Sequence, residues 1–263
     1  MIFCPLYSGS SGNSVFVGSK NTKILVDAGL PGKRIDEAIL SIGQNPKDLD
    51  GIFITHEHSD HIKGVGIISR KYDIPIYAND STWCAMESSL GKIKEYNIKV
   101  MDKRSTVEIK DMHIKSFCIP HDAAAPVGYT IFSRGKQASI ATDLGVFTEE
   151  IRENIKSSEV VLLESNHDVE MLKFGPYPYV LKRRVLSEIG HLSNDACGKA
   201  IVNLIKDGVL RNLYLGHLSN TNNHPDLAYQ TVLNILNENN IKVEKDISIS
   251  LAERHKPSKY IEF

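Results

Sequence analysis

The sequence lacks the long apolar runs and targeting features that direct a chain into a membrane or out of the cell. No stretch approaches the roughly 18 apolar residues of a membrane-spanning helix, and no basic segment opens the N-terminus. Cysteine is scarce, and none of the four has C-x-x-C spacing: Cys4, Cys84, Cys118 and Cys197. Such scattered cysteines favour reduced thiols over disulfides or zinc ligands. We therefore predict a cytoplasmic protein that makes no membrane contact.

Net charge and low-complexity sequence are also scarce. The formal net charge of the 263 residues is -1, so no global field attracts nucleic acid, although a local basic patch could. The hydrophobic content of 41% and charged content of 24% are ordinary for a globular protein. A chain of this length can form one large domain or two small ones. Because no linker or repeat array interrupts it, we predict a single domain over residues 1–263.

The hydrophobic pattern predicts strands that alternate with helices, which indicates an α/β fold. Strands are predicted at 2–7, 14–18, 23–26, 52–54, 74–78, 98–101, 106–109, 112–118, 127–133, 137–142, 160–164, 213–215, 246–251 and 259–262. Helices are predicted at 33–42, 62–70, 81–90, 148–156, 177–189, 194–206 and 225–237. Ser81 is the predicted cap of the third helix, and Ser193 or Asn194 that of the sixth.

Three histidines and an aspartate lie within six positions of one segment, in the pattern His-x-His-x-Asp-His. A short apolar run precedes it, so the segment lies where a buried strand ends and a loop begins. Alternate residues of an extended segment point the same way, so His56 and His58 can reach one ion. Asp60 and His61 lie past the turn and can reach a second ion. Imidazole and carboxylate ligands suit zinc and related divalent ions, whereas a solvated polar turn is the alternative.

This motif resembles the signature of the metallo-β-lactamase fold superfamily. The resemblance implies an αββα sandwich with the site at one edge of two facing sheets. It also places a site aspartate at Asp27, directly after the predicted strand 23–26. A carboxylate there would orient a metal-bound histidine, and capping of a helix is its alternative role.

Three further residues follow predicted strands and complete two metal sites. His121 supplies a third imidazole for the first ion, and His217 a third ligand for the second. Asp143 can bridge both ions with its two oxygens. We therefore predict one ion on His56, His58, His121 and Asp143, and another on Asp60, His61, His217 and Asp143. Zn²⁺ is the default and Mn²⁺ the alternative. Asp60 is also placed to orient the attacking water, which makes it a candidate catalytic residue.

The pentapeptide Gly-His-Leu-Ser-Asn occurs twice, at 190–194 and at 216–220. The second copy follows a predicted strand, as the other proposed ligands do, and it contains His217. His191 in the first copy lies between two predicted helices, so we predict a catalytic role for it on the substrate side. An imidazole near the scissile bond can stabilise developing charge or protonate the leaving oxygen. A structural role at the helix end is the alternative.

Two other segments favour a phosphodiester substrate. The Gly/Ser-rich loop at 8–13 exposes backbone N–H groups and could hold phosphate, although a plain hairpin turn is the alternative. Its candidate substrate contacts are Ser8, Ser10, Ser11 and Asn13. A basic run precedes His191, and phosphate contact or a solvated helix face would explain it. That run consists of Lys182, Arg183 and Arg184.

Longer motifs resemble the YycJ/WalJ family. They are Ser8–Ser14, Thr55–His61, Glu164-Ser165-Asn166-His167-Asp168 and Gly175–Arg184, followed by Gly190–Asn194. The resemblance implies a cytoplasmic metal-dependent 5′-to-3′ exodeoxyribonuclease of DNA repair, with Asn166 and His167 as candidate substrate contacts. His167 could equally be structural. Only 73 residues separate Asp143 from His217, which leaves no room for a large inserted domain. The core itself, with any partner in a repair complex, would grip the DNA. A thioesterase or cyclic phosphodiesterase of the same fold is the alternative.

Overall fold

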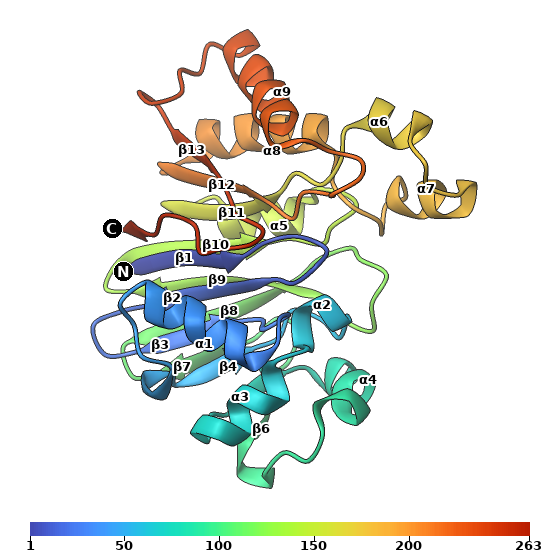
Figure 1. Ribbon diagram of the computed structural model, residues 1–263. Helices are drawn as coiled ribbons and strands as arrows, with labels where there is room; N and C mark the ends of the chain where they lie inside the picture. The colour runs from blue at the N-terminus through green and yellow to red at the C-terminus, as the bar shows by residue number, and fades with distance from the viewer.

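Two sheets packed face to face, with helices on their outer faces, form the molecule (Figure 1). The computed structural model describes residues 1–263, apart from the side chain of Asp207. The first seven-stranded sheet has the order β14-β1-β2-β3-β4-β5-β6, and the second has the order β13-β12-β11-β10-β9-β8-β7. This architecture confirms the predicted αββα sandwich.

The first sheet contains the N-terminal strands and the last strand of the chain. They are β1 (Ile2–Tyr7), β2 (Ser14–Gly18), β3 (Lys23–Val26), β4 (Gly51–Phe53), β5 (Ile76–Ala78), β6 (Ile98–Val100) and β14 (Ile261–Glu262). The second contains β7 (Thr106–Ile109), β8 (Met112–Cys118), β9 (Val127–Ser133), β10 (Lys136–Ala141), β11 (Val160–Glu164), β12 (Asn212–Gly216) and β13 (Ser248–Leu251). Strands β3 to β6 run parallel, as do β10 to β13. Their carboxyl ends therefore collect at one edge of each sheet, where ligands bind in α/β folds.

Helices cover the outer faces and follow the carboxyl ends of strands. The α-helices are α1 (Gly32–Ser41), α2 (Ser59–Ile62), α3 (Val65–Tyr72), α4 (Asp80–Leu90), α5 (Glu149–Ile155), α6 (Val169–Phe174), α7 (Tyr179–Val185), α8 (Asn194–Asp207) and α9 (Pro225–Glu238). Two 3-10 turns are η1 (Pro46–Asp48) and η2 (Glu95–Asn97). Most predicted elements agree with these bounds within about two residues, a normal uncertainty for helix ends. Ser193 caps α8, which was one of the two predicted caps.

The predicted helix 62–70 is confirmed over 65–70 by α3, but its start is wrong because the chain breaks at Gly64, between α2 and α3. In a continuous helix the Gly64 N–H would donate to the Asp60 carbonyl. Instead the Gly64 N–H donates to Ala28 O at 2.7 Å, and Asp60 O accepts from Asn13 N at 2.8 Å. Both groups thus tie the metal-motif segment to neighbouring loops.

Two other helix predictions need correction. Asn79, rather than Ser81, caps α4, and its side chain accepts from Thr82 N at 3.0 Å. The observed helix α7 (Tyr179–Val185) is shorter than the predicted helix 177–189. Pro178 favours extended backbone in the residue before it, so α7 begins only at Tyr179. The preceding helix α6 was missed, although Asp168 caps it by accepting from Met171 N at 2.8 Å.

The facing surfaces of the two sheets share one hydrophobic cluster. Phe3, Phe53 and Val26 of the first sheet pack in it with Tyr129 and Leu162 of the second. The Tyr129 hydroxyl donates to Ile54 O at 2.7 Å, just before the histidine motif. The packing of the sheets therefore holds that motif in place. Among the described residues, no helix is both long and apolar enough to span a membrane.

Candidate metal centre and active site

Left-handed backbone turns follow three strands at the edge of the sandwich. Asp27 follows β3, Asp143 follows β10 and His217 follows β12, with φ values of 60°, 59° and 52°. Residues with a Cβ adopt this conformation at a cost of roughly 1–2 kcal/mol each. Backbone strain of this kind persists where the surrounding structure imposes it, and functional sites often contain it.

The structure brings all seven predicted ligands together. Their ligand atoms form overlapping groups, within each of which the atoms lie within 4.8 Å of one another: His56, His58 and His121; His56, His61 and Asp143; and Asp60, His61 and His217. Asp143 lies between the two halves. Its Oδ2 is 3.3 Å from His61 Nε2, and its Oδ1 is 3.8 Å from His121 Nε2. A carboxylate in this position can bridge two ions.

Protein acceptors hold one ring nitrogen of several of these histidines. The Nδ1 of His61 donates to Asp27 Oδ2 at 2.8 Å, which is the contact predicted for Asp27. The Nδ1 of His121 donates to Gly190 O at 3.1 Å, and that of His217 donates to Glu164 Oε1 at 2.8 Å. In His121 and His217 the second nitrogen, Nε2, has no hydrogen-bond partner, whereas His61 Nε2 lies 3.1 Å from Asn13 Nδ2. Such contacts set the tautomer and orientation of metal-binding histidines.

Buried polar atoms without hydrogen-bond partners test whether these residues fit metal ions. They include His121 Nε2, His217 Nε2 and Asp143 Oδ2, among the described residues. A buried polar atom without a partner costs roughly 1–3 kcal/mol. All three atoms face the cluster, where divalent cations would satisfy them. The nitrogen and oxygen donor set therefore fits divalent ions such as Zn²⁺ or Mn²⁺.

The charges of the cluster balance one another in the metal-free protein. Burial opposes charge on His217, but Asp143, the Asp60 carboxylate 3.8 Å from Nε2 and the hydrogen bond to Glu164 raise its pKa to about 10. Burial likewise opposes charge on His61, yet Asp143 and Asp27 raise its pKa well above the usual value. In turn, the His217 and His61 charges outweigh burial and hold the pKa of Asp143 well below its usual range. In the metal-free protein, the positive charges of protonated His217 and His61 thus balance the Asp143 carboxylate, as bound cations would.

We expect metal uptake to release protons at neutral pH. His217, with its pKa of about 10, and His61 are protonated there, and a metal ion needs neutral imidazoles. The competing protons leave as pH rises, so the apparent Zn²⁺ affinity should increase about tenfold per pH unit for each proton released, up to the pKa of His217. Calorimetric titrations in buffers of different ionisation enthalpy count these protons. An affinity that is constant between pH 6.5 and 8.5 would contradict the charge arrangement.

Sequence reasoning missed one buried carboxylate at the centre of the site. Glu164, the last residue of β11, is 0% exposed. Its Oε1 accepts from the Nδ1 atoms of His191 and His217, each at 2.8 Å. Its Oε2 accepts from Leu144 N at 2.8 Å and from Leu192 N at 3.2 Å. One carboxylate therefore orients both Gly-His-Leu-Ser-Asn histidines.

Glu164 is ionised despite its burial. Burial would raise its pKa, but the His191 charge and hydrogen bonds to His191 and His217 lower it to about 2. A sequence signal for this residue was present, because a glutamate ends the otherwise apolar run 160–163. An acidic residue at the carboxyl end of a buried strand occupies the same kind of position as the predicted ligand Asp143.

His191 differs from His217 in its exposure. Its side chain is 20% exposed, whereas that of His217 is 3% exposed. The Nδ1 of His191 is held by Glu164 and lies 3.9 Å from Asp143 Oδ1. Burial opposes charge on His191, but Glu164 raises its pKa above the usual value. This exposure and raised pKa are what the predicted substrate-side role of His191 requires, and the role itself stays a prediction.

Comparisons with known proteins agree with this site. Residues 22–217 match the family model described as a beta-lactamase superfamily domain. Over 257 residues the chain is 39% identical to exodeoxyribonuclease YycJ of Bacillus anthracis. The matched region covers 98% of this chain and 97% of that protein. Over 246 residues it is 42% identical to exodeoxyribonuclease WalJ of Streptococcus pneumoniae, with 93% and 91% covered. The chain belongs to the YycJ/WalJ family.

Membership of the YycJ/WalJ family confirms the resemblance inferred from the sequence motifs, and it makes the chain a metal-dependent hydrolase of the beta-lactamase superfamily. A solved structure supports the fold independently. The metallo-beta-lactamase fold protein YhfI from Bacillus subtilis superimposes with a TM-score of 0.71 at 13% identity, over 98% of this chain and 100% of that one.

A pocket of about 140 Å³ adjoins the metal centre of this YycJ/WalJ-family chain. His191 and His217 line it, together with the predicted substrate residues Ser10, Asn166 and Arg184. Arg184 forms an ion pair with Asp122 at this pocket. Part of the predicted substrate set therefore lines one pocket with His191.

Part of the Gly/Ser-rich loop braces the cluster of predicted ligands, and its predicted role as a phosphate cradle stays a prediction. The Ser8 hydroxyl accepts from His217 N at 2.8 Å, and Asn13 Nδ2 donates to Asp60 Oδ2 at 3.2 Å. The Gly12 N–H donates within the loop, to Gly9 O. Ser10 and Ser11 are exposed on the loop and remain candidates for substrate contact.

The other predicted substrate residues lie outside the pocket lining. His167 is 1% exposed, and burial lowers its pKa to about 4, which favours its structural alternative. Lys182 Nζ donates to Lys173 O at 2.7 Å, so it links α7 to α6. Arg183 lies on the outer side of α7, 5.9 Å from the centre of the Tyr179 ring.

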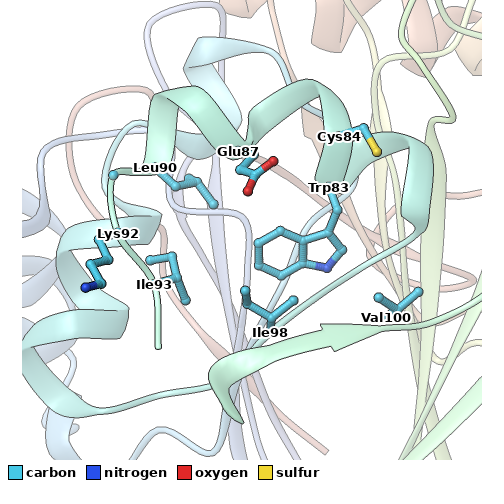
Figure 2. A pocket seen from close by; sticks show the side chains of 9 residues that line it. Trp83, Cys84, Glu87, Leu90, Lys92, Ile93, Ile98 and Val100 are labelled. Atoms are coloured by element: carbon cyan, nitrogen blue, oxygen red, sulfur yellow. The ribbon is translucent and has the colours of Figure 1, made fainter. Parts of the chain in front are cut away.

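A separate hollow of about 310 Å³ lies between α4 and β6 (Figure 2). Trp83, Ile98 and Val100 surround it, and the indole Nε1 of Trp83 donates to Lys99 O at 3.1 Å. Its nine lining residues contain one carboxylate and no histidine. This lining lacks the imidazole and carboxylate set that a metal-dependent reaction needs, so the chemistry belongs to the cluster at the strand ends.

Proposed function

We propose that this chain is a 5′-to-3′ DNA exonuclease that acts in cytoplasmic DNA repair and uses two divalent ions, Zn²⁺ by default and Mn²⁺ as the alternative. One observation carries the proposal: a seven-ligand cluster adjoins an imidazole that a buried glutamate holds at a small pocket. The names of YycJ and WalJ support DNA as the substrate. The fold alone would not, since it hosts many chemistries.

The residues of the chain divide the catalytic work between them. Two bound divalent ions would supply a water molecule of low pKa and a positive clamp on phosphate oxygens. Asp60, held by Asn13 and partly exposed, accepts a hydrogen bond from the attacking water and orients it. His191, kept protonated by Glu164, donates a proton to the leaving 3′ oxygen on the opposite side of the phosphorus.

The pocket beside His191 supports exonuclease rather than endonuclease action. Its volume of about 140 Å³ is small, and α7 closes one side of it with Leu181 and Arg184. Asn166 and Asn222 add neutral amides to the single Arg184 guanidinium. A small recess bounded on one side by α7 suits a terminal phosphate, whereas a continuing strand needs a groove that is open at both ends.

The proposal is tested with metal-reconstituted protein and end-labelled single- and double-stranded DNA and RNA. Mononucleotides should leave labelled DNA from the 5′ end, and Asp60→Ala should abolish their release. Hydrolysis of a thioester or cyclic diester in the absence of DNA cleavage would overturn the proposal and favour a small-molecule hydrolase.

His191→Ala tests the proton donor within the same experiment. We expect DNA hydrolysis to fall by about 10²–10³-fold, because the alkoxide leaving group needs a proton. Hydrolysis of bis-p-nitrophenyl phosphate should change much less, since p-nitrophenolate leaves without one. His167→Ala is the matched control, a buried neighbouring histidine off the pocket lining. Equal losses on both substrates would show that His191 acts otherwise.

A further inference from the structure

Arg254, which comes shortly after β13, lies against the Gly/Ser-rich loop beside the metal centre. Its Nη2 donates to Leu218 O, and its Nη1 donates to Ser10 Oγ at 3.4 Å. The guanidinium occupies the space into which a side chain at Gly9 would extend, because a Cβ added there would lie 2.9 Å from Cζ. The loop therefore has room for this one cation only because position 9 is a glycine.

The charge of Arg254 has no counter-ion in the protein. Arg254 is partly buried, and among the described residues no carboxylate forms an ion pair with it. The adjacent Glu253 carboxylate lies 3.6 Å from Lys256 Nζ instead. Burial lowers the pKa of the Arg254 guanidinium, and no acidic group offsets this effect. Because a buried cation without a partner is costly, an anion bound here would stabilise the site.

Further donors without protein partners lie on the same loop. The backbone N–H groups of Ser10 and Ser11 donate to no protein group among the described residues. Successive free N–H groups of a turn, next to a guanidinium with five N–H donors, are typical of anion-binding sites. Ser8 N donates to Glu253 O at 3.0 Å, which holds the loop and the segment that bears Arg254 together. These donors are thus in place before an anion binds.

Two hollows meet at Ser10 and Ser219, and Arg254 belongs to the second of them. Ser10 lines the small recess that contains His191, whereas Arg254 lines a separate hollow of about 400 Å³. Ser219 lines both. Arg254 therefore lies outside the recess, on the far side of Ser10. A strand that ends in the recess and continues past Ser10 would bring a later phosphate to this guanidinium.

We propose that Arg254, with the N–H groups of Ser10 and Ser11, binds the DNA phosphate next to the scissile one, on its 3′ side. The inference rests on the proposed 5′-to-3′ exonuclease function. A guanidinium can donate two parallel hydrogen bonds to phosphate oxygens. Such a contact fixes the register of the strand without reading its bases. Arg254 is thus a substrate-binding residue that sets which phosphodiester lies at the metal centre.

Oligonucleotide length tests the position of this phosphate. The dinucleotide d(pTpT) has only a terminal and a scissile phosphate, whereas the trinucleotide d(pTpTpT) also has the next one. We expect Arg254→Ala to lower kcat/KM of the metal-loaded protein about 10-fold more on the trinucleotide than on the dinucleotide, chiefly through KM. Arg254→Lys should recover part of this loss, because it keeps the charge. Equal losses on both lengths would show that Arg254 only braces the loop, and would overturn the proposal.

Binding to the metal-free protein gives a readout that does not depend on hydrolysis. The affinity of Arg254→Ala for a fluorescein-labelled single-stranded oligonucleotide, measured by anisotropy, should fall about 10-fold. The slope of log Kd against log salt concentration should decrease by about 0.7, the value for one lost phosphate contact. Oligonucleotides with a 5′-phosphate and with a 5′-hydroxyl should show the same loss. A loss confined to the 5′-phosphorylated strand would assign Arg254 to the terminal phosphate and overturn the proposal.

Arg211→Ala is the matched control. Arg211 also donates to a backbone carbonyl, Leu210 O at 3.3 Å, but it precedes β12, at the opposite end of that strand from His217. Its loss should change neither the length dependence nor the salt slope. Equal effects of Arg211→Ala and Arg254→Ala would show that net charge alone matters, and would overturn the proposal.

The proposed function fails separately, if the unaltered protein cleaves no DNA while it still hydrolyses bis-p-nitrophenyl phosphate. The anisotropy measurement still tests Arg254 in that case. If instead the unaltered protein degrades DNA, and Arg254→Ala does so with the same KM and the same salt slope, only the assignment of Arg254 is wrong.

Discussion

Asp143→Asn is expected to lower DNA hydrolysis by about 10³-fold, a loss typical for removal of a principal electrostatic group from an active site. The two Asp143 oxygens face both halves of the cluster: Oδ2 lies 3.3 Å from His61 Nε2, and Oδ1 lies 3.8 Å from His121 Nε2. Asparagine would place an amide NH₂ on one side, which repels a cation and cannot bridge. Elemental analysis should then find about one ion per chain instead of two.

A second readout comes from the metal-free protein. Burial opposes charge on His217, and Asp143 is the chief group that raises its pKa to about 10. Without that carboxylate the pKa should fall, which NMR titration of the ring would detect. Asp111→Asn is the matched control, a partly buried aspartate that accepts from Ser19 and Thr22 away from the cluster. Two bound ions and an undiminished rate in Asp143→Asn would refute its bridging role.

The convergence of the predicted ligands could be foreseen because each group of them comes after a strand. Parallel strands bring their carboxyl ends to the same edge of a sheet. A short stretch of sequence, an apolar run followed by a polar residue, is therefore enough to place that residue at the edge. The compact His-x-His-x-Asp-His motif added four ligands at once. Both arguments use local order, and the structure brings the predicted side chains within 4.8 Å in overlapping groups.

Roles that depend on distant partners could not be predicted in this way. Glu164 bonds His191 and His217, which follow it by 27 and 53 positions. Ser8 supports His217 across 209 positions, a contact that the composition of its loop does not reveal. The break at Gly64 has the same origin, because Ala28 and Asn13 take over the hydrogen bonds that a helix would form. Local propensity gives way wherever tertiary contacts offer a stronger alternative.

Glu164→Gln is expected to impair both stability and chemistry, because no orientation of the amide satisfies its surroundings. Two imidazole N–H groups donate to Oε1, and the backbone N–H groups of Leu144 and Leu192 donate to Oε2. In either orientation, the glutamine NH₂ would face N–H groups that also donate, in a fully buried position. We expect the free energy of unfolding to fall by roughly 3 kcal/mol, measured by urea denaturation of the metal-free protein.

The pH dependence of this variant separates the role of Glu164 from a general loss of packing. The depressed pKa of Glu164, about 2, stabilises the native protein above the unfolded value near 4.5, and this contribution disappears as pH falls through 2. Glutamine has no such contribution, so the stability difference should vanish at low pH. For catalysis, Glu164 raises the pKa of His191. As pH rises, activity that requires protonated His191 should therefore be lost at a lower pH in the variant than in the unaltered protein.

The rate on DNA should also fall by about 10²-fold at neutral pH, since the group that orients two active-site histidines is gone. Glu150→Gln provides the comparison, because Glu150 likewise accepts a backbone N–H, from Cys118, and a charged side chain, Arg104, but lies outside the cluster. Its pH–rate profile should match that of the unaltered protein. If the alkaline limb of the Glu164→Gln profile stays in place while stability drops, Glu164 holds the fold together without tuning His191, and the proton donor must lie elsewhere.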